Sequence, residues 1–175
     1  DLAILHAMGI KVVLVHGFRP QVNEQLQAKG KVPRFSHGQR ITDAVALDCA
    51  QEAAGQLRFA LAAAFSQGLP NTPVAGATGR MISGNFLTAR PVGIMDGVDF
   101  QHSGLVRKVD TAGITRTLDM GALVLLSPFG YSPTGEAFNL SMEEVATSVA
   151  IELQADKLIF MTEVPGIHMQ PGEPA

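Results

Sequence analysis

The chain has 175 residues, of which 46% are hydrophobic and 17% are charged, and its formal net charge is −3 with a pI near 5.9. These values indicate a globular domain and exclude a disordered chain. They also argue against nucleic acid as a partner, because an acidic chain has no basic surface to gather phosphates.

The first half of the chain predicts helices that alternate with strands. Pro20 suits the first turn of a helix, and Thr42 or Asp43 is expected to cap a long helix that ends at Gly68. The expected elements are a helix over 2–8, a buried strand over 10–16, a helix over 20–29, a basic loop over 29–40 and the long helix over 42–69. The apolar stripe of the long helix is Leu47, Ala50, Ala54, Leu57, Leu61 and Phe65.

The second half opens with a small β excursion near residues 79–109 and then returns to alternation. The expected elements after it are a helix over 111–119, a buried strand over 122–130, a helix over 141–154 and a buried strand over 157–164. Ser141 is the expected N-cap of its helix, and Glu144 completes a capping box.

Continuous apolar strands alternating with helices predict an α/β protein, a three-layer αβα sandwich with a mainly parallel central sheet. Residues 10–16, 121–126 and 157–162 are expected to be neighbouring parallel strands of that sheet.

The only cysteine, Cys49, lies in a helical pattern, and we expect a buried packing residue in a reducing compartment. No apolar run reaches the length of a membrane span and no signal-peptide pattern opens the chain, so the sequence predicts a cytoplasmic protein without membrane partners.

Ligands of such sheets bind beyond the carboxyl ends of the strands, where the Gly17 turn, Arg19, Arg40 and Asn139 should converge. Arginine binds carboxylates and phosphates through two parallel hydrogen bonds. Each residue also has a simpler interpretation. Arg19 could be a solvated helix-start residue, Arg40 could pair with Asp43, and Asn139 could cap the next helix.

Other common sites have no signal in the sequence. The five histidines are dispersed, so no metal site is expected, and His16 is interpreted as a packing residue. The G-x-S-x-G, G-x-G-x-x-G and G-x-x-x-x-G-K-S/T patterns are absent. Glu143 and Glu144 favour a negatively charged first helical turn over an acid/base pair.

Four segments, read together, resemble the amino-acid kinase family. They are a strand followed by His-Gly-x-x-Pro and a helix, then "RITDA", "FNLSMEEVA" and "DKLIFMTEVPG". The block "GVDFQHSGLVRKVD" resembles the kinase-like domain of the N-acetylglutamate synthases within that family. The resemblance covers essentially the whole chain.

The resemblance implies a regulatory and assembly domain that is not catalytic by itself. In such synthases a separate acetyltransferase domain moves acetyl from acetyl-CoA to L-glutamate, in the first step of arginine biosynthesis, and L-arginine is the feedback inhibitor. We therefore expect residues 1–175 to be a single, truncated kinase-like domain without its first strand, its C-terminal part and the acetyltransferase domain. We also expect that this chain binds no cofactor itself and that it forms a homo-oligomer.

The sequence differs from the acetylglutamate kinases of this family in the turn that follows the predicted strand over 10–16. The kinase pattern has three glycines after the histidine, whereas Phe18 and Arg19 occupy the second and third places here. Asn139 keeps the first place of the kinase's Asn-x-Asn-x-Asp pattern, Ser141 takes the second and Glu143 the third. We expect a turn that no longer holds a phosphate and a vestigial carboxylate site at Gly17, Arg19, Arg40 and Asn139. The alternatives are an acetylglutamate kinase or a stand-alone amino-acid-sensing module.

Overall fold

A parallel sheet forms the centre of the computed structural model, which describes residues 2–67 and 79–162. Its strands are β1 (Val13–Val15), β9 (Leu123–Leu126) and β4 (Met81–Ser83), in the order β1-β9-β4. Val13 pairs with Val124, and Ile82 pairs with Val124 from the other side. The predicted adjacency of the first two apolar strands is therefore confirmed.

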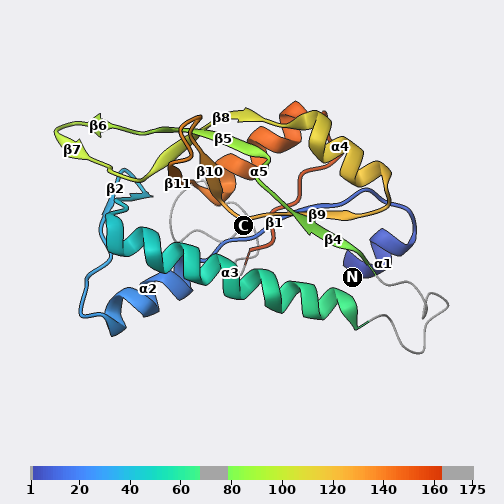
Figure 1. Ribbon diagram of the computed structural model, residues 1–175, viewed down its shortest axis with the longest axis horizontal. Coiled ribbons are helices and arrows are strands. Elements are labelled where there is room, and N and C mark those ends of the chain that lie inside the picture. Colours follow the sequence, from blue (N-terminus) through green and yellow to red (C-terminus); the bar gives the residue numbers. More distant parts are fainter. Residues whose placement is uncertain (1, 68–78, 163–175) are drawn as a thin grey trace, which may run out of the picture.

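Helices cover both faces of this sheet (Figure 1). They are α1 (Leu2–Ala7), α2 (Arg19–Ala28), α3 (Ala44–Ser66), α4 (Thr111–Asp119) and α5 (Met142–Glu152). The long helix α3 runs along one side, and α4 and α5 lie on the other. All four residues of β9 are buried, since its side chains alternate between two covered faces. This arrangement is the α/β architecture that the sequence predicts.

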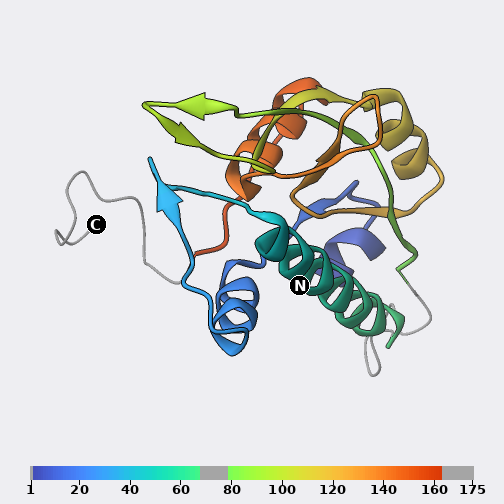
Figure 2. The same cartoon turned by 60° about the vertical axis from the view of Figure 1, so that its left-hand side comes forward.

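A second sheet, β11-β10-β5-β8, packs above the first. Its strands are β5 (Leu87–Pro91), β8 (Gly104–Val109), β10 (Phe129–Tyr131) and β11 (Ala137–Asn139). Two short hairpins complete the structure, β2 (Phe35–Ser36) with β3 (Gln39–Arg40) and β6 (Ile94–Met95) with β7 (Val98–Asp99). In Figure 2 both hairpins reach toward the same side of the molecule, where His37 Nε2 lies 3.0 Å from Asp96 Oδ2.

Three local expectations change within these elements. Residues 29–40 are not wholly irregular, because the β2–β3 hairpin forms there. Residues 81–83 belong to the parallel sheet and not to the β excursion. The predicted strand over 122–130 divides into β9 and β10, which lie in different sheets, and Ser127 and Pro128 stand between them.

The expected strand over 157–162 is wrong for the described residues. These residues form no strand and their side chains are exposed, with Ile159 at 73% and Met161 at 85%. A run of apolar residues becomes a parallel strand only when a neighbouring strand pairs with it and helices cover it. The third strand of the sheet is β4 instead. The expected end of the long helix at Gly68 lies outside the described residues. The last two residues of the expected strand over 157–164 also lie outside them.

The apolar stripe of α3 also differs from the predicted one. Its buried residues are small, namely Ala46, Cys49, Ala50, Ala53 and Ala54. They pack against Phe18, Val22 and Leu26 at the start and along α2. Small side chains let two helices approach closely, so the short residues are buried and Leu47 and Leu57 are only half-buried. Cys49 is a buried free thiol, as expected.

Side-chain caps define where the helices begin. Asp43, and not Thr42, caps α3 by accepting a hydrogen bond from the backbone N–H of Ala46 at 2.8 Å. Ser141 caps α5, as predicted, and accepts from the backbone N–H of Glu144 at 3.4 Å. The reciprocal half of the capping box does not form, because Glu144 Oε1 accepts from the backbone N–H of Val106 instead. Glu144 thereby ties α5 to β8.

No helix within the described residues is long and apolar enough to cross a membrane.

Candidate functional site

A cavity of about 100 Å³ lies beyond the carboxyl ends of β1 and β9. The starts of α2 and α5 border it, and the β3 end of the β2–β3 hairpin closes one side. The four residues that the sequence singles out all line this cavity. Its lining consists of Gly17, Phe18, Arg19, Gln39, Arg40, Ser103, Pro128, Asn139, Leu140, Ser141, Met142 and Glu143.

Arg40 is the buried cation of the cavity, with 7% of its surface exposed. Its Nη2 donates a 2.6 Å hydrogen bond to Asn23 Oδ1, and its Nη1 is buried without a partner. The predicted alternative, an ion pair with Asp43, does not form, since Asp43 caps α3. Burial, together with the nearby charge of Arg19, lowers the pKa of Arg40. A buried guanidinium with no carboxylate partner among the described residues is costly and favours an anion beside it.

Arg19 lies near Arg40 because both guanidinium groups contact one aromatic ring. Their Cζ atoms are 5.4 Å and 4.7 Å from the centroid of the Phe35 ring, for Arg19 and Arg40 respectively. The attraction between a cation and a π face offsets part of the repulsion between two like charges. Arg19 is solvent-exposed, as its simpler interpretation expects, but it also lines the cavity. Phe35 was not predicted as part of the site, because only the β2–β3 hairpin brings it there.

Three buried hydroxyl and amide side chains hold the Arg40 segment in place. Ser103 Oγ accepts from the backbone N–H of Thr42 at 3.1 Å and donates to the carbonyl of Arg40. Thr42 Oγ1 accepts from Asn139 Nδ2 at 3.0 Å and lies 2.9 Å from Ser103 Oγ. The alternative interpretation, that Asn139 caps the next helix, is therefore wrong, and Ser141 is the cap as predicted. Segments far apart in the sequence meet here, at the edge of the cavity.

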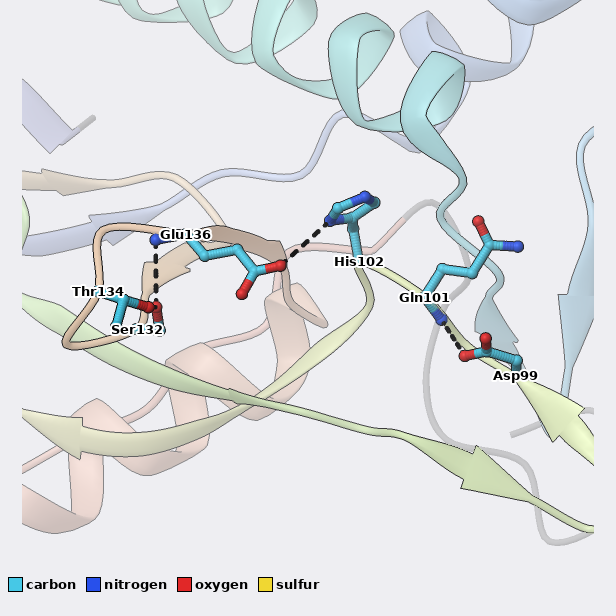
Figure 3. Close-up of polar contacts among 6 residues, drawn as sticks. All are labelled: Asp99, Gln101, His102, Ser132, Thr134 and Glu136. Atoms are coloured by element: carbon cyan, nitrogen blue, oxygen red, sulfur yellow. Dashed lines mark hydrogen bonds and ion pairs between the residues drawn. The ribbon is translucent and has the colours of Figure 1, made fainter.

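The segment that carries Ser103 is anchored on its outer side as well (Figure 3). The His102 ring points toward Glu136 on the β10–β11 connection, but its Nδ1 lies 4.0 Å from Glu136 Oε1 and has no hydrogen-bond partner among the described residues. The backbone N–H of Gln101 donates to Asp99 Oδ1 at 2.9 Å.

The turn after β1 is filled by side chains where a phosphate cradle would need bare backbone. Phe18 is 5% exposed, and its ring centroid lies 5.5 Å from that of Phe129. A Cβ atom on Gly17 would lie 3.0 Å from the sulfur of Met142, so a side chain at this position would require Met142 to shift. No side chain caps the start of α2. The Phe18 side chain therefore belongs to the core.

His16 links the two central strands at their carboxyl ends. Its Nε2 lies 2.7 Å from Ser127 Oγ, and 9% of the residue is exposed. Burial lowers the pKa of His16. The residue is thus a packing residue that bridges β1 and β9, as the sequence analysis interprets it, and it does not line the cavity.

Glu143 is the residue of the cavity that the sequence analysis did not place there. Ser141 Oγ donates a 2.7 Å hydrogen bond to Glu143 Oε2. This hydrogen bond is the main reason that the pKa of Glu143 is lowered, and the Arg19 charge acts in the same direction. Glu143 and Glu144 point to different places, as neighbours on a helix must. The signal that could have placed it there is its position in "FNLSMEE", the third place of the kinase's Asn-x-Asn-x-Asp pattern.

The arrangement suits a small anionic group and not a nucleotide. Ligand pockets for drug-sized molecules enclose about 300–1,000 Å³, and the cavity has about 100 Å³. Its two guanidinium groups match a carboxylate. Among the described residues, no three His, Cys, Asp or Glu side chains are grouped as ligands of a metal ion.

Comparisons with known proteins agree with this fold and identify the family of the chain. A family model described as the amino acid kinase family matches residues 1–174. An amino-acid acetyltransferase of Ralstonia nicotianae is 60% identical over 173 residues, which are 99% of this chain and 38% of that protein. An amino-acid acetyltransferase of Pseudomonas fluorescens is 51% identical over 173 residues, which are 99% of this chain and 40% of that protein.

A solved structure is similar over almost the whole chain. The crystal structure of N-acetylglutamate synthase from Neisseria gonorrhoeae complexed with coenzyme A and L-arginine superimposes with a TM-score of 0.90 and 40% sequence identity. The match covers 96% of this chain and 39% of that one. The chain therefore spans about two fifths of the length of the relatives it matches.

Proposed function

Because this chain belongs to the amino acid kinase family, we propose that it is the kinase-like regulatory and assembly domain of an N-acetylglutamate synthase. The proposed enzyme acetylates L-glutamate with acetyl-CoA in the first step of arginine biosynthesis, and L-arginine inhibits it. The observation that carries the proposal is the 60% identity over 173 residues to an amino-acid acetyltransferase. We also propose that the protein is cytoplasmic.

The proposal assigns acetyl transfer to sequence outside this chain. Relatives of the same kind are more than twice as long as the region they share with this chain. The volume of the cavity, about 100 Å³, is far below that of a cofactor site. We therefore propose that these residues bind no acetyl-CoA and support the assembly of a homo-oligomer.

The second candidate, a phosphotransferase of the same family, is disfavoured by the turn after β1. Phosphoryl transfer depends on donors placed around the transferring group. The side chain of Phe18 is buried in the core of α2 and α3, and Arg19 carries its guanidinium to Phe35. Neither position leaves the bare backbone that a phosphate needs.

We further propose that Gly17, Arg19, Arg40 and Asn139 form a carboxylate site that survives from the kinase-like ancestor. Support comes from the buried Nη1 of Arg40, which has no partner, and from the second guanidinium on the same cavity. A charge-assisted hydrogen-bond pair contributes about 1.5–3 kcal/mol. Loss of that contact corresponds to a weakening of about 10-fold to 150-fold.

Activity of the intact protein tests the main proposal. Release of free thiol from acetyl-CoA should require L-glutamate and should fall as L-arginine is added, and light scattering should show an assembly larger than one chain. ADP formation with N-acetyl-L-glutamate and ATP, without any thiol release, would reverse the assignment and support the kinase.

Binding of propionate to the intact protein tests the carboxylate site. The methyl resonance of [¹³C-methyl]Met142 is a local reporter, because Met142 lines the cavity. We expect Arg40→Ala to weaken propionate by about 10-fold to 150-fold and Arg40→Lys to weaken it less, since lysine keeps the charge without the planar fork. Equal affinity in wild type and both variants would refute the site.

A further inference from the structure

A second cavity lies between the end of α2, the connection from α2 to β2 and the start of α3. Its volume is about 280 Å³, which is larger than that of the first cavity. Figure 2 shows the connection from α2 to β2 running beside the start of α3. No residue lines both cavities, so the proposed carboxylate site does not account for this one.

The floor of the second cavity is apolar and buried. Leu26, Ile41 and Ala46 line it, and each is at most 8% exposed. Leu26 and Ala46 belong to the apolar cluster between α2 and α3, whereas Ile41 is buried outside both apolar clusters of the described residues. Protein interiors leave few voids larger than a water molecule, so buried side chains beside a cavity of this size are unusual. This floor can accept the apolar body of a ligand.

The rim of the second cavity is cationic. Lys31 and Arg34 line it, are solvent-exposed and form no ion pair with the described residues. Asp43 also lines the cavity, but its Oδ1 caps α3 by accepting from the backbone N–H of Ala46. Two cations and one carboxylate leave a surplus of one positive charge. Such a lining favours a monoanion over a dianion, because a second negative charge would be repelled by Asp43.

Backbone hydrogen bonds hold both cationic residues beside the floor. The N–H of Lys31 donates to the carbonyl of Leu26 at 2.8 Å, and the N–H of Ile41 donates to the carbonyl of Arg34 at 2.9 Å. Gly30, with a φ of +69°, makes the turn between the end of α2 and Lys31. The rim is therefore tied to the floor without any ligand, as is usual for sites that bind small molecules.

A ligand that matches this cavity has one negative charge and a compact apolar body. An apolar cavity of about 150 Å³ holds benzene, so about 280 Å³ can hold a ring together with a short charged group. We propose that the second cavity binds a small organic monocarboxylate. Its apolar body would lie against Leu26, Ile41 and Ala46, and its carboxylate at Lys31 and Arg34. This site goes beyond the proposed function and does not depend on it.

The two parts of the cavity contribute differently to binding. Exposed cations are screened by salt and water, so each adds little affinity by itself. Burial of the apolar body supplies the larger part of the affinity. The cations then select an acid over its neutral analogue. An anion without an apolar body should therefore bind weakly.

Benzoate is the probe for the intact protein. The ¹³C δ1-methyl resonance of Ile41, assigned with Ile41→Val, is the local reporter, because Ile41 lines the second cavity and not the first. We expect benzoate to shift this resonance saturably. Benzamide keeps the ring without the charge and should bind at least about fivefold more weakly. Acetate and inorganic phosphate keep a charge without the ring and should each bind at least about tenfold more weakly.

Two matched double variants separate the cavity from general surface charge. Lys31→Gln with Arg34→Gln should weaken benzoate at least about fivefold and change benzamide by less than about twofold. Lys29→Gln with Arg58→Gln is the control, since it removes the same charges from exposed residues that line neither cavity. The control should change benzoate affinity by less than about twofold. The other Ile methyl resonances report whether each variant keeps its fold.

Each outcome decides part of the inference. Benzamide binding as tightly as benzoate, or full benzoate affinity in Lys31→Gln with Arg34→Gln, would overturn the choice of an anion. Acetate or phosphate binding as tightly as benzoate would overturn the apolar contact. Absence of any Ile41 shift would overturn the site itself.

Two further measurements keep this site apart from the other proposals. Loss of the benzoate shift in Arg40→Ala, with the shift retained in Lys31→Gln with Arg34→Gln, would assign the signal to the first cavity and refute the second site. Arg40 lines only the first cavity, so we expect Arg40→Ala to bind benzoate at the second one as wild type does. Thiol release from acetyl-CoA is measured separately, so failure of the proposed function would be distinguishable from failure of this site.

Discussion

Ser103→Ala removes the hydroxyl that holds the Arg40 segment to the rest of the cavity wall. Ser103 is 1% exposed, and its Oγ accepts from the backbone N–H of Thr42 and donates to the carbonyl of Arg40. Alanine fits the same space but leaves the Thr42 N–H buried without an acceptor. The consequence should be local opening of the junction between β3, the "DFQHSG" block and β11.

The magnitude follows from two of the three hydrogen-bond contacts of Ser103 Oγ, those with the Thr42 N–H and the Arg40 carbonyl. A buried N–H left without a partner costs about 1–3 kcal/mol, and the ordinary hydrogen bond to the Arg40 carbonyl contributes about 0.5–1.5 kcal/mol. We expect a total near 3 kcal/mol, which is about a 100-fold change in an opening equilibrium.

Amide hydrogen exchange of the intact protein measures this opening. The informative amides are those of His102 and Asn139, which donate to the carbonyls of Thr42 and His102 and keep their own hydrogen bonds in the variant. Both should exchange about 100-fold faster in Ser103→Ala if exchange reports the opening equilibrium. Thr147→Ala, at an exposed residue of α5, is the control and should change them little, since surface substitutions stay within about 0.5 kcal/mol. Acceleration by less than about fivefold would refute the reasoning, because it equals less than about 1 kcal/mol.

Three further predictions concern the turn after β1. Phe18→Ala should destabilise the protein by about 3–5 kcal/mol in denaturant unfolding, because the ring is buried, whereas Phe59→Ala, at a side chain that is 72% exposed, should have little effect; similar losses in both variants would contradict the assignment of Phe18 to the core. Burial holds the pKa of His16 below 6.5, so the unfolded chain binds the proton more readily and the free energy of unfolding should fall as the pH drops below about 6.5. His16→Gln should reduce this fall in urea midpoints compared between about pH 7.5 and 5.5, and an unchanged pH dependence would refute the attribution to His16. ATP and N-acetyl-L-glutamate should yield no ADP in a coupled assay, because Phe18 and Arg19 stand where the kinase pattern has its second and third glycines; steady turnover would contradict this.

Local signals in the sequence determined most of the elements and the family of the fold. The apolar runs at 13–15 and 123–126 become the paired strands β1 and β9, and Pro20 and Ser141 mark the starts of α2 and α5. These features depend on residues close together in the chain, where periodicity, proline geometry and capping act directly. The convergence of Gly17, Arg19, Arg40 and Asn139 followed from a general property of parallel sheets, whose carboxyl ends meet at one edge.

Only the tertiary structure decided which polar groups meet and which apolar runs are buried. Glu143 and Glu144 are equivalent in local sequence, yet one lines the cavity and the other holds the Val106 amide of β8. The apolar residues 157–162 are exposed, whereas β4 takes a place in the sheet. Ser103, Thr42 and Asn139 form one buried network across separations of 61 and 97 residues. Such contacts depend on distances in space between elements distant in the chain, and neither hydrophobic period nor capping pattern contains that information.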